Sequence, residues 1–120
     1  MARMIELRTA IQAKLETIHP RVFFQDVPPE AEYPYLVFNI PDILDDGESM
    51  EVAVVDVDGW SKGADTTILE TLMATVNLGL NKKTLNGIAF YLDIKLALQD
   101  DDPRIQRRKY TYQAQIFKRG

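Results

Sequence analysis

Carboxylates and cations gather at three places in this 120-residue sequence, and each group suggests a different chemistry. The first is an acidic segment around Gly47, with Asp42, Asp45, Asp46 and Glu48. The second is the closely spaced pair Asp56 and Asp58. The third is the stretch DDDPRIQRRKY at residues 100–110, in which three aspartates precede four basic residues. Carboxylate oxygens suit Mg²⁺ or Ca²⁺, whereas arginine and lysine suit phosphate.

The two acidic groups fit metal binding poorly. The acidic segment could hold magnesium, but surface loops are also acidic for solubility, which is the interpretation we favour. Asp56-Val-Asp58-Gly59 is similar to part of a calcium-binding loop, yet Val54 stands where the first carboxylate should be. We therefore interpret these two aspartates as the solvent face of a strand, and we expect no metal site.

The stretch at 100–110 allows three interpretations. Its cations could grip phosphate, although the preceding aspartates weaken the field that a nucleic-acid site needs. It could be a solvated hairpin with local ion pairs, which contribute little individually. It could also pair with a neighbouring copy, because opposite charges fix register and orientation. Its candidate residues are Asp100, Asp101, Asp102, Arg104, Arg107, Arg108 and Lys109.

Residues that carry catalysis are scarce elsewhere. There is one histidine, His19, for which we expect a solvated or capping role, and there is no cysteine. The usual zinc ligand sets are therefore excluded. The segment Gly59-Trp-Ser-Lys-Gly63 lacks the spacing of a phosphate-binding loop. We expect no catalytic residue, no cofactor and no enzymatic activity.

Length and composition are typical of one ordinary globular domain. We expect residues 1–120 to form a single domain, with 46% apolar and 27% charged residues. The net charge of −4 argues against a dedicated DNA-binding domain, whose affinity comes mainly from basic residues. The apolar runs are too short to span a bilayer, and Glu6 interrupts the position of a signal peptide, so we expect no membrane partner.

Apolar spacing predicts two helices. In residues 3–18, apolar side chains recur three and four positions apart, and His19-Pro20 should end the helix because the residue before proline disfavours it. A second stripe follows Asp65, a candidate N-cap, and ends near Asn81. The first stripe comprises Met4, Leu7, Ile11, Leu15 and Ile18, and the second comprises Leu69, Leu72, Met73, Val76 and Leu80.

Alternating side chains predict strands at 21–25, 35–40, 50–60, 88–98 and 110–116. Proline-rich residues 27–34 and the acidic residues 42–49 should be loops. Alternation is strictest in 88–98, so Leu92 and Ile94 should both face the core. The expected fold is α+β: a two-layer sandwich, with a mostly antiparallel sheet of about four to five strands and two helices on one face, in the order α-β-β-β-α-β-β.

The order and spacing of five segments resemble a known family across nearly the whole chain. The segments are Ile5–Leu15, Val22–Pro29, Tyr33–Phe38, Val55–Gly63 and Arg108–Ile116. Together they resemble the tail-completion, or tail-terminator, proteins of long-tailed bacteriophages and prophages, which act in head–tail joining.

The resemblance implies a structural role in the virion, at the head-proximal end of the tail, after assembly in the host cytoplasm. Members form rings, usually hexamers, that cap the tail tube, stop its polymerisation and offer the head an attachment surface. The implied partners are further copies of the chain, the tail-tube protein and a head-completion or connector protein. DNA would pass through the ring without specific binding, as a negatively charged lumen favours. The family offers no catalytic residue.

Other classes stay open at this point. The chain could be another virion joining protein, such as a head-completion or tube protein, or a small α+β oligomerisation module; a small metal-dependent enzyme is a further alternative. As subunit-interface candidates we take the charged residues of the acidic segment and of the stretch at 100–110. Reversing Arg107 and Arg108 to glutamate is expected to block assembly while leaving the monomer folded.

Overall fold

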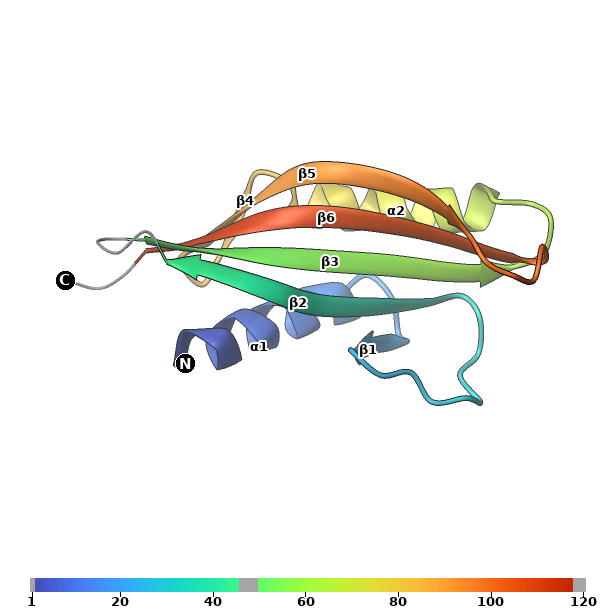
Figure 1. Cartoon of the computed structure of the whole chain (residues 1–120), viewed down its shortest axis with the longest axis horizontal. Helices are drawn as coiled ribbons and strands as arrows, with labels where there is room; N and C mark the ends of the chain where they lie inside the picture. Colours follow the sequence, from blue (N-terminus) through green and yellow to red (C-terminus); the bar gives the residue numbers. More distant parts are fainter. Residues whose placement is uncertain (1, 46–49, 118–120) are drawn as a thin grey trace.

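A six-stranded sheet curls around two helices in the computed structural model, which describes residues 2–45 and 50–117 (Figure 1). The strands lie in the order β1-β2-β3-β6-β5-β4, with β1 parallel to β2 and all other pairs antiparallel. Along the chain the elements are α1 (Ala2–Glu16), β1 (Val22–Phe24), β2 (Tyr35–Asp45), β3 (Met50–Lys62), α2 (Thr67–Leu80), β4 (Lys83–Leu85), β5 (Ile88–Gln99) and β6 (Ile105–Phe117).

Both helices pack on the inner face of the sheet and share one core with it. The predicted helical stripes are confirmed, because Leu7, Ile11 and Leu15 of α1 are fully buried. The same holds for four residues of α2, namely Leu69, Met73, Val76 and Leu80. The sheet contributes alternate residues from its long strands, namely Leu36, Phe38, Ile40, Ala53, Val55, Val57, Ile88, Phe90, Tyr112, Ala114 and Ile116. One apolar face per element therefore builds this core.

The predicted α+β class is confirmed, but two details of the predicted architecture are wrong. The sheet curls, so it is not a simple two-layer sandwich: Figure 1 shows α1 beneath β2 and α2 behind β5 and β6. The sheet also has one more strand than the upper predicted number, because β4 forms a hairpin with β5. Its turn is Asn86-Gly87, with both φ angles positive at 51° and 79°. Asn-Gly is a strong hairpin signal that the sequence interpretation overlooked.

The strand β2 runs further than predicted, into the acidic segment. Asp42 and Asp45 pair with Val54 and Glu51 of β3, so these two positions are strand and not loop. The register shifts between Asn39 and Asp42, which marks a bulge around Pro41. Proline fits there because its missing N–H is tolerated at bulges and sheet edges. Asp46 and Glu48 lie outside the described residues.

A second bulge corrects the prediction that Leu92 and Ile94 share a face. Leu92 pairs with Tyr112, but Ile94 pairs with the next residue of β6, Thr111, so Asp93 is an extra residue. An extra residue moves every later side chain to the other face. Leu92 therefore packs against the core, whereas Ile94 is 47% exposed on the opposite face.

His19, predicted to be solvated or to cap a helix, uses its side chain to fix the proline-rich loop, while its backbone N–H donates to the Leu15 carbonyl oxygen at the end of α1 at 2.9 Å. Helix α1 ends at Glu16, and His19 Nε2 lies 2.8 Å from the carbonyl oxygen of Pro34. Arg21 Nε donates to the same oxygen at 3.0 Å. The predicted absence of regular structure in 27–34 is confirmed.

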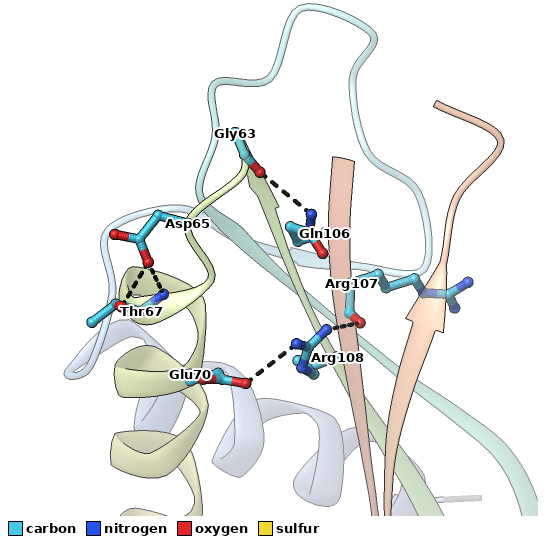
Figure 2. A network of polar contacts seen from close by, with 7 residues as sticks. All are labelled: Gly63, Asp65, Thr67, Glu70, Gln106, Arg107 and Arg108. Carbon is cyan, nitrogen blue, oxygen red and sulfur yellow. Dashed lines mark hydrogen bonds and ion pairs between the residues drawn. The ribbon is translucent and has the colours of Figure 1, made fainter. Parts of the chain in front are cut away.

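Close packing of α2 on β3 requires a glycine. A Cβ placed on Gly59 would lie 2.6 Å from Met73 Sδ and 2.9 Å from Leu69 Cδ1. Gly63 then ends the strand with a φ of 117°, and Asp65 Oδ1 accepts the backbone N–H of Thr67 at 2.9 Å (Figure 2). The predicted capping carboxylate therefore acts from one residue before the N-cap, which is Thr66.

Candidate assembly surface

The outer face of the sheet, turned away from both helices, carries an ion pair set against aromatic rings. Arg107 on β6 donates from Nε and Nη2 to one oxygen of Asp58 on β3, at 2.7 and 2.6 Å. The two residues come from neighbouring strands, with Asp58 opposite Lys109 in the register. Only 11% of the Asp58 side chain and 29% of the Arg107 side chain are exposed. Asp58 lies on the face predicted for it, away from the helices, but the prediction that it is exposed to solvent there is wrong.

Aromatic side chains complete this cluster. The Arg107 guanidinium lies over the Trp60 ring at 4.8 Å, a cation–π contact. Trp60 in turn stacks on Tyr35, with ring centroids 6.2 Å apart and planes 17° apart. Phe23 meets Tyr35 edge-on at 5.9 Å. Trp, Tyr and Arg are the residues most enriched at the energetic centres of protein interfaces.

A second polar group continues the cluster along the same two strands. Thr111 Oγ1 donates to Asp56 Oδ1 at 2.7 Å, and Lys109 Nζ lies 3.9 Å from the other oxygen of Asp56. An open pocket of about 360 Å³ lies over this region, lined by Gln25, Val27, Tyr35, Val37, Asn39, Asp56, Asp58, Trp60, Arg107 and Lys109. Two aspartates and two cations balance within it, so the pocket has no excess charge to attract a highly charged ligand.

Burial shifts the pKa values of two groups in this cluster. Burial raises the pKa of the Asp58 carboxyl, and the contact with Arg107 opposes that effect. Burial likewise raises the pKa of Tyr35 to about 12, with the neighbouring Tyr33 adding to the shift. No group of three or more His, Asp or Glu residues that could hold a metal ion occurs among residues 2–45 and 50–117. Among the residues that the structure describes, this surface therefore combines an open pocket, aromatic rings and paired charges.

Arg108 points to the other side of β6 from Arg107 (Figure 2). Its Nη2 lies 3.3 Å from Glu70 Oε1 on α2, and its Nη1 donates to the Arg107 carbonyl oxygen at 3.1 Å. Beside it, Gln106 Nε2 donates to the Gly63 carbonyl oxygen at 3.4 Å. These contacts tie the N-terminal end of α2 and the preceding loop to the sheet.

The turn between β5 and β6 is held by its own acidic residues. Asp102 Oδ1 accepts the backbone N–H of Arg104 at 2.9 Å, and Asp102 Oδ2 lies 2.9 Å from Arg104 Nη2. Asp100 Oδ1 accepts the backbone N–H of Asp102 at 3.0 Å. The hydrogen bonds that Asp102 accepts from the side chain and the backbone of Arg104 lower the pKa of its carboxyl to about 2. Asp101 and Pro103 are exposed at the tip.

The predicted interface residues thus divide into three groups. Arg107, Arg108 and Lys109 each form an ion pair within the chain, on two different faces of the sheet. The turn residues and Asp42 remain available at the surface, although Asp100 and Asp102 also stabilise the turn. Asp45 is placed only by its backbone, and Asp46 and Glu48 fall outside the described residues. A contact with a neighbouring subunit stays a prediction for all of them.

The ion pairs argue against the expectation that Arg107 and Arg108 can both be reversed without harm to the fold, which stays a prediction. A glutamate at position 107 would place a second carboxylate beside the buried Asp58, where like charges repel. The sequence interpretation did not bring Asp58, Trp60 and Tyr35 together in one cluster. The signal for it was the charge order on β3 and β6, with Asp56 and Asp58 on one strand and Lys109 and Arg107 on the other.

Helices long and apolar enough to cross a membrane are not found among the described residues. No family model matches the sequence, and no curated protein matches it. Among solved structures, the fold is shared with a chain of the virion of a native gene transfer agent (GTA) particle. The two chains match with a TM-score of 0.78 and 14% sequence identity, over 93% of this chain and 95% of that chain. At this identity the likeness is one of fold.

Proposed function

We propose that this chain is a structural protein of a phage-like virion, and more specifically a tail terminator. It would form a ring, a hexamer as in the family it resembles, that caps the tail tube and presents a surface to the head. The observation that carries the proposal is the end-to-end match to a virion chain of the gene transfer agent particle. The match leaves no large part of either chain unaccounted for.

The proposal also covers the partners of the ring and its lack of enzymatic activity. The ring would contact the tail-tube protein on one side and a head-completion or connector protein on the other, with DNA passing through without specific binding. We propose no enzymatic role, because two groups that could transfer protons are engaged within the chain. Asp58 is held by Arg107, and His19 is held by a backbone carbonyl.

The turn at 100–104 is our candidate for contact with the tube or the head. Figure 1 shows the β5–β6 turn at one end of the long sheet, opposite the end at which α1 begins. Asp101, Pro103 and Arg104 are exposed there, and Arg104 keeps 71% of its side chain accessible. A rigid turn with exposed charge suits a contact that requires a fixed orientation.

Deletion of the gene from the phage or prophage that carries it tests the role. We expect filled heads without attached tails, and tails of irregular, often excessive length by electron microscopy. Supplying the wild-type chain from a plasmid should restore joined particles. Tails of normal length beside leaking heads would favour a head-completion role, and a complete lack of tubes would favour a tube protein; either result would contradict the tail-terminator proposal.

Supplying variants of the turn tests its part separately. Arg104→Glu should leave the chain folded, because its ion pair is exposed, while lowering the yield of joined particles. Arg8→Glu is a matched control, since it reverses one exposed cation on α1. Equal yields from both variants would remove the turn from the joining surface.

A further inference from the structure

We propose that neighbouring copies of this chain join edge to edge, so that the sheet of one subunit continues into the sheet of the next. The inference rests on the proposed ring, and it names the surfaces that close it. Both lateral edges of the sheet end in a three-residue strand, and each short strand covers only part of the long strand beside it. We call these two borders the β4 edge and the β1 edge.

The β4 edge leaves most of β5 open. Strand β4 pairs only with Ile88–Phe90, and Asn81 Oδ1 accepts the backbone N–H of Leu92 at 2.9 Å. Within the described chain, no strand pairs with that side of β5 from there to Gln99. An open edge strand of this length is a template for another chain.

The β1 edge leaves the opposite end of the sheet open. Strand β1 pairs with Leu36–Phe38, and Gln25 N–H donates to the Phe38 carbonyl oxygen at 3.0 Å. In the described structure, residues 39–45 of β2 have a partner strand on the β3 side alone. Here too the open segment lies beside a short strand.

The register across the sheet shows that the two edges have complementary outlines. Following the paired residues from strand to strand places β4 level with the open part of β2, and β1 level with the open part of β5. The first correspondence runs Thr84, Ala89, Gln115, Val52, Leu44. The second runs Leu96, Lys109, Asp58, Val37, Phe23. When two copies lie side by side without an offset, each short strand therefore faces the open segment of its neighbour.

Strand directions also fit this arrangement. Strands β1, β2, β4 and β6 run one way and β3 and β5 the other, because β1–β2 is the single parallel pair within the described sheet. In a continuous sheet, β5 would pair antiparallel with the neighbour's β1, and β4 would pair parallel with the neighbour's β2. Both ladders are allowed, and a head-to-tail contact between unlike edges is the kind that closes into rings.

Charge and apolar surface agree with the register. Lys83 at the β4 edge comes level with Ile43 of the neighbour's β1 edge. Lys82 precedes Lys83 in the chain as Asp42 precedes Ile43, and continuing the row by one residue places Lys82 beside Asp42. Lys82, Lys83 and Asp42 are all exposed, so each subunit would place two cations beside an acidic strand. Leu44, which is 58% exposed, comes level with Thr84. These contacts favour unlike edges over two copies of the same edge.

The bulge at Asp93 supplies the remaining apolar surface. It turns Ile94, Leu96 and Leu98 away from the core of their own chain and onto the outer face beside the open edge. Ile94 and Leu96 are 47% and 42% exposed. Leu96 comes level with the neighbour's Phe23, whose ring already packs on Tyr35. Without a partner, an apolar open edge invites aggregation, and a closed ring removes both edges.

Disulfide trapping tests the arrangement cleanly because the chain has no cysteine of its own. Leu44→Cys and Thr84→Cys lie four strand spacings apart within one subunit, roughly 19 Å, too far for a bond. Between neighbours they would lie about 5 Å apart, within disulfide range. We expect the two single variants, mixed and oxidised as assembled rings, to give cross-linked dimers, and the double variant to give a ladder of larger species.

The control is a pair from the same edge, Thr84→Cys mixed with Leu96→Cys, which should not cross-link. Absence of the Leu44–Thr84 bond in assembled rings would overturn the proposal. Dimers formed by the Thr84→Cys variant alone would overturn it too, because they would show like edges in contact.

Charge exchange gives a second, independent test. Lys82→Glu and Asp42→Lys should each raise the concentration needed for assembly by up to about fivefold per contact, and the double variant should assemble close to wild type. Two additive losses would contradict the pairing of these residues.

The result can be separated from that of the gene deletion. Loss of tail-length control on deletion, with no Leu44–Thr84 bond, would refute the edge contact and leave the tail-terminator role intact. Cross-linking with normal tails after deletion would support the contact and refute the role.

Discussion

Truncating Arg107 should destabilise the fold more than truncating any exposed cation of the same hairpin. In Arg107→Ala, the Asp58 carboxylate keeps its burial, with 11% of its side chain exposed, and loses both guanidinium donors. Breaking a fully buried ion pair by removing one partner costs about 3–5 kcal/mol. Because 29% of the Arg107 side chain is exposed, we expect about 2–3 kcal/mol, including the contact with Trp60.

Urea unfolding at neutral pH, followed by circular dichroism on dilute protein, measures this loss. Arg104→Ala is the matched control, since it removes an arginine whose carboxylate partner, Asp102, lies with it in the exposed turn. Its unfolding midpoint should stay close to that of the wild type. Asp58→Asn completes a double-mutant cycle, in which Arg107→Ala should cost less once the buried charge is gone.

Two results would refute the reasoning. If Arg107→Ala unfolded at the same urea concentration as Arg104→Ala, the buried pair would not contribute to the stability of the fold. If Arg107→Ala and Asp58→Asn were additive, the loss would come from packing of the arginine side chain and not from the stranded carboxylate.

Three further predictions concern the core, the bulge and pH. Gly59→Ala should lower the free energy of unfolding by about 1–3 kcal/mol through overpacking, and by less in a Met73→Ala background; equal losses in both would contradict the clash. Leu92→Ala should reduce monomer stability more than Ile94→Ala, while Ile94→Ala should weaken assembly more, as urea unfolding and analytical ultracentrifugation can compare. Because burial raises the pKa of Asp58, the folded state binds the carboxyl proton more tightly than the unfolded state does. The stability that this proton gives is full below about pH 3.9 and is lost as the pH rises through the folded pKa. Wild type should therefore lose stability relative to Asp58→Asn over that pH range, and an unchanged difference between their urea unfolding midpoints would contradict this.

Much of the fold could be predicted from the sequence because helix and strand periodicities are local. The four-residue spacing of Leu7, Ile11 and Leu15 can bury one stripe in only one regular structure. Alternation at Tyr112, Ala114 and Ile116 determined the core face of β6 in the same way. The α+β class follows from these local patterns.

The bulge at Asp93 shows where local periodicity stops being informative. The alternation from Ile88 to Leu98 looks uninterrupted in the sequence, yet β6 sets the register, and one unpaired residue sends the second half to the opposite face. A run of alternating aliphatic residues cannot say which of its members will meet the chain's own core. That decision depends on the partner strand.

For the candidate surface, the sequence shows which types of residue are available, and only the tertiary structure shows which of them come together. The sequence determined that residues 100–109 would carry both signs of charge, and that the chain would have one histidine and no cysteine. Only the pairing of β3 with β6 brings Arg107 to Asp58, across forty-nine positions of sequence, and turns the adjacent Arg108 toward Glu70. Neighbouring residues of a strand point to opposite faces, so one basic run was divided between two surfaces by the pleat of the sheet.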